Sequence, residues 1–258
     1  MSEQHRPGGD AAPVVRSADR RDLPQTVTVL TDALLHDPAW QHVVPDRCQR
    51  ETALRCVLAV AVADAGEQVR VAVDPQSGQV RAVAVWQRPG LYPMSTGRAL
   101  RCLPKLLPLL RLGRVARDVR RFGTGLDAAF PREPVHYLQA LGVTPDWQHL
   151  GLGTVMLQDG LAIVDAPGGP CYLETGNPAN LRWYEKQGFA SDPPGGAALW
   201  PAGPTMWRMQ RPGLPTSHDP SVIQPLRDRM TFGLRDDAGM PVALHNQRRG
   251  GSVRSGGA

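Results

Sequence analysis

Residues 135–164 constrain the fold of this chain more than any other stretch. The segment "VHYLQALGV" (135–143) is rich in leucine, aromatic and β-branched residues, which predicts a strand. A proline-containing turn follows, then the run Gln148-His149-Leu150-Gly151-Leu152-Gly153, then an apolar helix to about Val164. Two glycines at the entrance of a helix leave backbone N–H groups free and let an anion approach closely. The stretch therefore predicts a strand, an anion cradle and a helix, in that order.

The glycine run excludes two familiar phosphate-binding motifs. A P-loop needs Gly-Lys-Ser/Thr, and no lysine precedes Thr154. A dinucleotide-binding motif needs a third glycine, and Met156 stands at that position. What remains is a pyrophosphate cradle built from backbone amides and a helix N-terminus, with no metal ion implied. Taken alone, the same residues also fit an ordinary glycine-bearing turn before a helix.

Composition limits the class of protein. The chain has 258 residues, a net charge of +5 and only 5% aromatic residues, so a nucleic-acid partner with stacking aromatics is not expected. No uncharged apolar run reaches the roughly 18 residues of a membrane span, and the N-terminus lacks the apolar core of a secretory signal. We therefore expect a cytoplasmic protein without a membrane partner. The scattered cysteines favour neither a metal site nor a disulfide, and we expect them to be small buried apolar residues (Cys48, Cys56, Cys102 and Cys171).

The hydrophobic pattern predicts alternating strands and helices around the glycine run. We expect a disordered N-terminus at 1–12, one folded domain at 13–212, and a mostly flexible tail at 213–258 that contains a hairpin-like stretch at 230–244. Period-two alternation predicts strands, and period-3.6 spacing predicts helices. The predicted strands are 13–18, 68–73, 79–86, 135–143, 171–175 and 204–211. The predicted helices are 19–35, which Asp37-Pro38 ends, then 47–63, 91–130 in part, 152–164 and 177–187.

Residues 91–130 are the unusual part of the chain. A stripe of leucines precedes a run of arginines, and Pro104 and Pro108 interrupt the helical pattern. Because proline breaks or kinks a helix, we expect two shorter helices here. The arginines fit either a solvated helix face or a flap that brings positive charge near an anionic ligand (Arg111, Arg114, Arg117, Arg120 and Arg121).

A second motif, "NPANLRWYEKQGF" (177–189), follows the glycine run at a fixed distance. The two motifs in this order resemble the GNAT (Gcn5-related N-acetyltransferase) superfamily. Over residues 131–211 the chain is similar to the puromycin N-acetyltransferase group of actinobacterial enzymes. The resemblance implies an α/β GNAT fold: a mixed, mostly antiparallel and splayed central sheet flanked by helices. It also implies that 91–130 is a helical insertion before the CoA-binding strand.

The resemblance further implies acetyl-CoA as co-substrate and assigns residues to its parts. The pyrophosphate would lie on the cradle. The pantetheine arm would lie against the main chain of a β-strand and against the second motif. In this chain the cradle is Gln148, His149, Leu150, Gly151, Leu152, Gly153 and Thr154. The pantetheine side is Leu141, Gly142 and Val143 with Asn177 and Asn180, and we expect Gly142 to mark a splay or bulge of the strand.

Two residues are candidates for the chemistry. The resemblance places Tyr184 where the family has its general acid, although an aromatic core contact is the alternative. By strand alternation Tyr172 and Glu174 face the same way, and a carboxylate in a partly apolar cleft can have the raised pKa of a general base. The alternative for Glu174 is a capping or surface role, and the rival base is His136. Trp40, Trp86 and Tyr92 lie in segments that would wall an acceptor pocket.

The function expected from these features is direct transfer of an acetyl group to the primary amine of a small molecule. An antibiotic or related metabolite is among the candidate acceptors, which would make the enzyme one of antibiotic resistance. The alternatives are acetylation of protein α-amines or lysines, O-acetylation of a hydroxyl, and a non-catalytic acyl-CoA-binding module. We expect a monomer or homodimer without a metal cofactor.

Overall fold

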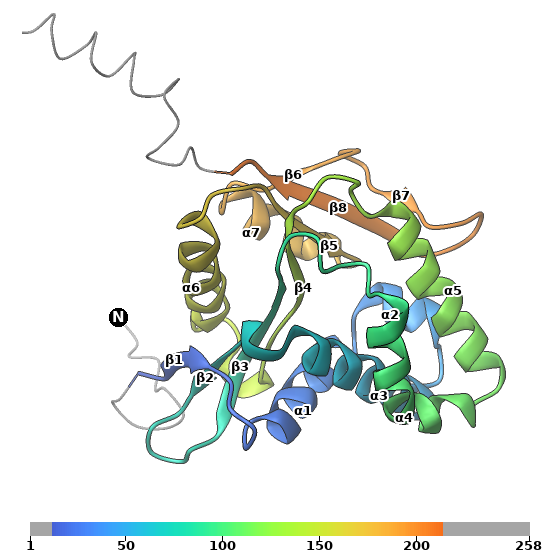
Figure 1. Cartoon of the computed structure of the whole chain (residues 1–258), viewed down its shortest axis with the longest axis horizontal. Helices are drawn as coiled ribbons and strands as arrows, with labels where there is room; N and C mark the ends of the chain where they lie inside the picture. Colours follow the sequence, from blue (N-terminus) through green and yellow to red (C-terminus); the bar gives the residue numbers. More distant parts are fainter. Residues whose placement is uncertain (1–11, 214–258) are drawn as a thin grey trace, which may run out of the picture. The chain divides into compact units, whose positions relative to one another are not determined.

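The computed structural model describes residues 12–213. The hairpin-like stretch at 230–244 and nearly all of the expected termini lie outside these residues. Strands, α-helices and short 3-10 helices alternate along the described chain (Figure 1). The strands are β1 (Val14–Ser17), β2 (Val69–Val73), β3 (Val80–Gln87), β4 (His136–Val143), β5 (Cys171–Thr175), β6 (Ala190–Ser191), β7 (Ala197–Ala198) and β8 (Thr205–Arg211). The helices are α1 (Leu23–Leu34), α2 (Pro38–Val43), α3 (Arg47–Ala65), α4 (Thr96–Leu110), α5 (Arg114–Ala129), α6 (Leu152–Asp165) and α7 (Leu181–Glu185), with η1 (Gly66–Gln68), η2 (Pro145–Trp147) and η3 (Pro178–Asn180).

The strands form one mixed sheet, mostly antiparallel as predicted. Its order is β1-β2-β3-β4-β5-β8-β6, and β7 pairs with β8. Within the described residues β4 and β5 are the parallel pair, and they pair only from His136↔Cys171 to Leu138↔Leu173. Beyond Leu138, β4 continues to Val143 while β5 turns away. The sheet is therefore open between its two halves at this point.

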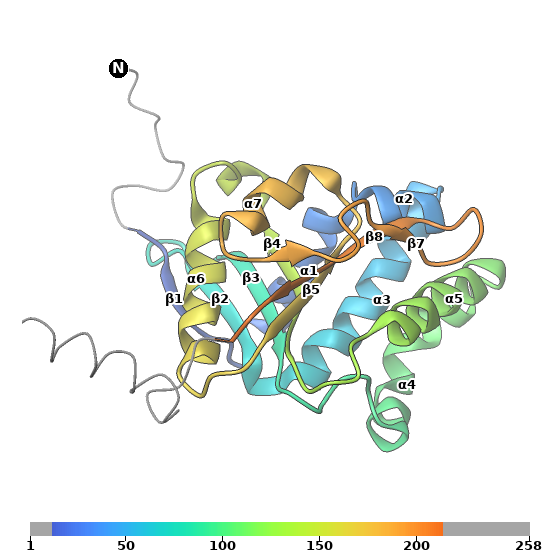
Figure 2. The ribbon, with the colours of Figure 1, turned by 90° about the horizontal axis from the view of Figure 1, so that it is seen from above.

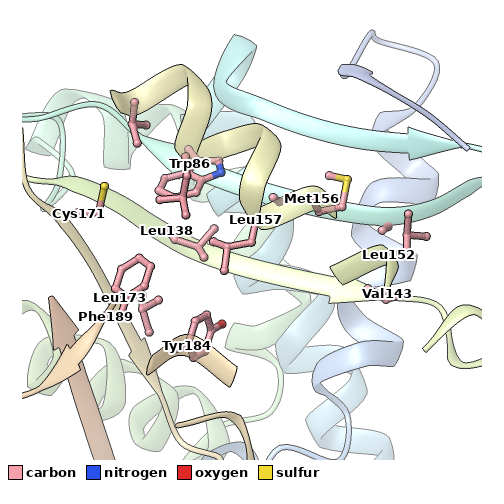
Figure 3. Close-up of a cluster of buried hydrophobic side chains, with 14 of the residues drawn as sticks. Trp86, Leu138, Val143, Leu152, Met156, Leu157, Cys171, Leu173, Tyr184 and Phe189 are labelled. Carbon is pink, nitrogen blue, oxygen red and sulfur yellow. The ribbon is translucent and has the colours of Figure 1, made fainter. Parts of the chain in front are cut away.

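Helices cover both faces of the sheet, with α6 on one side and α3, α4 and α5 on the other (Figure 2). On the α6 side, Met156 and Leu157 are fully buried against sheet residues such as Leu138 and Leu173 (Figure 3). On the other side, α1 and α3 pack leucines and valines against β2 and β3. Each fully buried aliphatic side chain contributes about 1.5–3 kcal/mol, so these two layers carry most of the apolar stabilisation.

The strands predicted at 68–73 and 79–86 are confirmed, and they pair antiparallel as β2 and β3. The prediction that Asp37-Pro38 ends a helix is incomplete. Asp37 does follow the end of α1, yet it also begins α2, because its Oδ1 accepts hydrogen bonds from the N–H groups of Ala39 at 2.9 Å and Trp40 at 3.2 Å. Proline is well suited to the first position of a helix, so Pro38 starts α2 rather than preventing it.

The insertion forms two helices, as predicted, but the break is not at the prolines. Helix α4 runs through Pro104 and Pro108 and ends at Leu110; Gly113, at a φ of 51°, then starts α5. Both prolines are exposed and lie four residues apart, so the carbonyls that lose a partner face water on one side of the helix. Of the two interpretations of the arginine run, the solvated helix face fits the structure, because all five arginines are exposed, and Arg121 stacks over Trp200 at 4.4 Å.

The bulge in β4 lies at Gln139 and not at Gly142, whereas Gly142 does lie on the part of β4 that has separated from β5. Val85 pairs with Ala140 and Trp86 with Leu138, so Gln139 is the extra residue of a bulge. Gly142 pairs regularly with Val83, and a Cβ on it would lie 2.8 Å from the Cβ of Ala33. Glycine is therefore needed there for the close packing of α1. The bulge in turn lets Leu138 and Leu141 contact the same core under α6.

Candidate active site

A cavity of about 250 Å³ lies where β4 and β5 separate. Its walls come from α2, α3 and α5 on one side and from β4, the end of β5 and α7 on the other. Helix α5 contributes its inward face, including Val119, Phe122 and Leu126. The insertion therefore does shape this cavity, although through apolar residues and not through its arginines.

Glu174 is the second-last residue of β5 and lines this cavity. Its carboxylate accepts hydrogen bonds from the hydroxyls of Tyr172 at 2.8 Å and Tyr137 at 3.1 Å. Burial raises the pKa of Glu174 from 4.5 to about 7, because the cost of removing the charge from water exceeds the help of the two donors. Burial also raises the pKa values of both tyrosines, so each remains a protonated donor. Glu174 is thus a carboxyl group that titrates near neutral pH in a cavity.

Tyr184 reaches the same cavity from α7 and is 8% exposed. Its ring packs against Trp183 and Phe189, with centroids at 4.7 and 6.0 Å. Figure 3 shows its hydroxyl pointing away from Leu173 and Phe189. Among the described residues the hydroxyl has no hydrogen-bond partner, and burial together with the charge of Asp37 raises its pKa above the ordinary value of 10.0. The aromatic core role and a free hydroxyl in the cavity are therefore both present.

Four other predicted residues separate into two groups. Trp40 and Tyr92 line the cavity as expected. Trp86 does not: it is buried under α6, where a Cβ on Gly160 would meet its Nε1 at 2.2 Å. His136 is not among the lining residues either; it lies at the start of β4, with Nε2 3.3 Å from the carbonyl oxygen of Gly168. His136 therefore lies in the wrong place to act as the general base in this cavity.

The predicted cradle is a turn followed by the N-terminus of α6. His149 and Gly151 have positive φ angles of 62° and 84°. None of the six N–H groups from His149 to Thr154 donates to another described residue, since the first helical bond runs from Val155 to Gly151. Six free donors at the positive end of a 14-residue helix fit a pyrophosphate group.

Ion pairs anchor helix α6, and a side-chain hydrogen bond anchors the turn before it. Arg70 of β2 and Arg211 of β8 each make a two-point ion pair with an aspartate of α6, Asp159 at 2.7 and 3.0 Å and Asp165 at 2.6 and 2.9 Å. Gln148 does not point outward: its Nε2 donates to the carbonyl oxygen of Val143 at 3.0 Å. Its side chain therefore fixes the turn to the end of β4.

The predicted pantetheine residues lie around the opening between β4 and β5. Leu141 and Asn180 line the cavity. Gly142 and Val143 lie on the part of β4 that has no β5 partner, so their main chain has no strand on that side. Asn177 caps η3, with its side-chain oxygen accepting from the N–H of Ala179 at 3.0 Å.

The described residues contain neither a cysteine in the cavity nor a cluster of metal ligands. All four cysteines are free and none lines the cavity; three are buried as expected, whereas Cys48 is exposed. No three His, Cys, Asp or Glu side chains between residues 12 and 213 come together in a way that could hold a metal ion. Nor is any helix in that range long and apolar enough to span a membrane.

Two features of the site were missed from the sequence. Tyr137 is the second donor to Glu174, and only the pairing of Tyr137 with Tyr172 across β4 and β5 would have indicated it. Asp37 lines the cavity opposite the strand of Glu174, where Oδ1 would lie 3.0 Å from a Cβ on Gly176. Its signal was the Asp-Pro pair, which is typical of a helix start as well as of a helix end.

Comparisons with known proteins agree with this geometry. Residues 115–189, which run from α5 through the cradle and the second motif to Phe189, match the model of the Acetyltransferase (GNAT) family. The chain is similar to the structure described as histone acetyltransferase HPA2 and related acetyltransferase from Corynebacterium glutamicum, with 23% identity, a TM-score of 0.55, and 80% of this chain and 99% of that chain covered. It is also similar to arylalkylamine N-acetyltransferase 2 from Aedes aegypti, with 11% identity, a TM-score of 0.50, and 77% and 97% covered. At these identities the likenesses concern the fold.

The splayed mixed sheet, mostly antiparallel and flanked by helices, has the GNAT fold. Residues 115–189, which carry the cradle and the second motif, match the model of the GNAT family on this fold.

Proposed function

We propose that the enzyme transfers acetyl from acetyl-CoA directly to the primary amine of a small molecule, with Glu174 as general base and Tyr184 as general acid. The observation that carries this assignment is the position of both groups in one cavity at the opening of the sheet. Glu174 has a pKa of about 7, which suits a base at neutral pH.

The residues fit acetyl-CoA as substrate. The free N–H groups from His149 to Thr154 would hold the pyrophosphate, and the unpaired main chain of β4 beyond Leu138 would bind the pantetheine amides. Asn177 and Asn180 would lie along the same arm. This arrangement directs the thioester toward the cavity that holds Glu174 and Tyr184.

The proton balance uses both side chains. At neutral pH the acceptor arrives as R–NH3⁺, and Glu174 takes one proton and later releases it to solvent. The amine nitrogen then bonds to the acetyl carbon, and the carbon–sulfur bond breaks. Tyr184 donates its proton to the leaving sulfur, and the second proton from the nitrogen replaces it on Tyr184. The sum is an amide, free CoA and one proton.

The cavity favours direct transfer to a small acceptor. An acyl-enzyme route would need a nucleophile, and no cysteine lines the cavity. Helices α2, α3 and α5 wall it in, which suits a small molecule better than a folded protein. A protein α-amine or lysine acceptor and a hydroxyl acceptor are the alternatives to be tested.

The test is a thiol-release assay with acetyl-CoA and a panel of small amines that includes puromycin, for wild type and Tyr184→Phe. We expect turnover in the wild type and a strong loss of kcat in the variant, with acetyl-CoA binding by calorimetry retained in both. Binding of acetyl-CoA without turnover of any amine would contradict the small-amine assignment. Turnover that is equal in both proteins would contradict the role of Tyr184.

A further inference from the structure

The cavity holds a second carboxylate that the acetyl-transfer scheme does not use. Asp37 directs one oxygen, Oδ1, to the N–H groups of Ala39 and Trp40. Its other oxygen, Oδ2, makes no hydrogen bond or ion pair with any described residue, and Asp37 is one of the residues that line the cavity. Burial raises its pKa, so the surroundings give the charge little solvation. Asp37 is half-buried, and a half-buried carboxylate with a free oxygen in a cavity is a site for a hydrogen-bonding cation.

The charge of the cavity differs in sign from that of the chain. The chain has a net charge of +5 with 29 lysine and arginine residues, yet none of these cations is among the lining residues. The charged side chains there are Asp37 and Glu174. An acceptor that carries its own carboxylate would meet these two acids with no cation among the lining residues, since Arg208, whose charge acts on Glu174, is not one of them; this disfavours its binding.

The rest of the wall is apolar and aromatic. Five of the 14 aromatic residues (six Trp, four Tyr, four Phe) line the cavity: Trp40, Tyr92, Phe122, Tyr137 and Tyr184. Trp40 and Phe122 form an edge-to-face pair with centroids at 5.4 Å. Such a wall accommodates an apolar ring or chain and leaves the hydrogen-bonding groups of a polar, multiply charged amine unpaired.

We propose that Asp37 binds the ammonium group of the incoming acceptor, and that the site selects monoamines with an apolar, ring-sized body and no acidic group. This inference rests on the proposed function and names the substrate class of the same cavity. Asp37 is then a binding residue, separate from the base Glu174. The acceptor's apolar body would lie between α3 and α5, with its amine toward the opening of the sheet.

Three matched amines test the substrate class in the wild type: phenethylamine, phenylalaninamide and phenylalanine. They share one ring, and phenylalanine alone carries a carboxylate. We expect kcat/KM for phenylalanine to be at least 100-fold lower than for the other two. Equal rates for phenylalanine would overturn the inference, as would turnover of glutamate or lysine but not of phenethylamine. In both cases acetyl transfer itself would stand, whereas no turnover of any amine would count against the proposed function.

The role of Asp37 is tested with Asp37→Asn, because asparagine keeps the oxygen that caps α2 and removes the charge. The matched control is Asp46→Asn, since Asp46 caps α3 in the same way, at 2.8 Å from the nitrogen of Gln49, but is exposed and outside the cavity. We expect KM for phenethylamine to rise at least tenfold in Asp37→Asn, with KM for acetyl-CoA unchanged. The control should change neither. An unchanged amine KM, or equal effects on both substrates, would overturn the role.

Discussion

Replacing Glu174 by glutamine removes the charge from the cavity while keeping the length of the side chain. If Glu174 is the base, kcat should fall by roughly 100-fold or more, which is the usual size of such a loss. In the wild type the acid limb of the kcat/KM profile should have a midpoint near pH 7, the pKa of the folded-state carboxyl. That limb should be absent from the residual activity of the variant.

The same substitution should change how stability depends on pH. The folded-state pKa of Glu174 is raised from 4.5 to about 7, so the folded protein holds this proton more tightly than the unfolded chain. The stabilisation is complete below pH 4.5 and is lost as the pH rises through 7. At about 1.36 kcal/mol for each tenfold change in affinity, the total loss is about 3 kcal/mol, most of it between roughly pH 5 and pH 8.5.

The assay is urea unfolding of wild type and Glu174→Gln across that pH range. The variant should gain about 2–3 kcal/mol relative to wild type between the acidic and the alkaline end. Glu67→Gln is the matched control, because Glu67 is exposed in η1 and far from the chemistry proposed here. A difference between wild type and Glu174→Gln that does not vary with pH would refute the reasoning from burial.

Three further substitutions separate the parts of the site. Tyr184→Phe removes a hydroxyl that has no partner among the described residues, so kcat should fall about 100-fold while the melting temperature changes little; a large loss of stability would contradict this. Gly153→Ala places a Cβ at an ordinary 3.6 Å from Val143, so thermal unfolding should be unaffected or slightly improved, whereas calorimetry should show at least tenfold weaker acetyl-CoA binding. Unchanged binding would remove Gly153 from the cradle. Gly160→Ala places a Cβ at 2.2 Å from Nε1 of Trp86 and should destabilise the fold by about 1–3 kcal/mol in urea, and full stability would show that this contact relaxes easily.

Local patterns predicted most of the fold because the signals in this chain are strong. Alternation found β2 and β3, and the apolar helix after the glycine run is α6. The helix break predicted at Pro104 and Pro108 was wrong for a physical reason. Proline inside a helix is costly because one carbonyl loses its N–H partner, but in α4 both prolines are exposed, so water can take the place of that partner. Sequence spacing does not show which side of a helix is solvated.

The site was predicted less completely than the fold. Glu174 and Tyr184 were found because each lies in a motif or at a strand end, and both reach the cavity. Asp37 and Tyr137 were missed because their relevance depends on residues about 37 to 147 positions away in sequence, brought close only by the sheet. The bulge at Gln139 could not be predicted from the alternation of polar and apolar residues. An extra residue in a strand reverses the side of the sheet to which every later side chain points.

The short contact between β4 and β5 leaves an edge whose occupation by a ligand would change the stability of this protein. Three residue pairs join the two halves of the sheet there, and the remaining edge of β4 is left for a ligand. A ligand that binds only the folded state stabilises it by about 2.7 kcal/mol when its concentration is 100 times Kd. Under the proposed function that ligand is acetyl-CoA, and its concentration would then shift the free energy of unfolding, which thermal unfolding with and without acetyl-CoA measures.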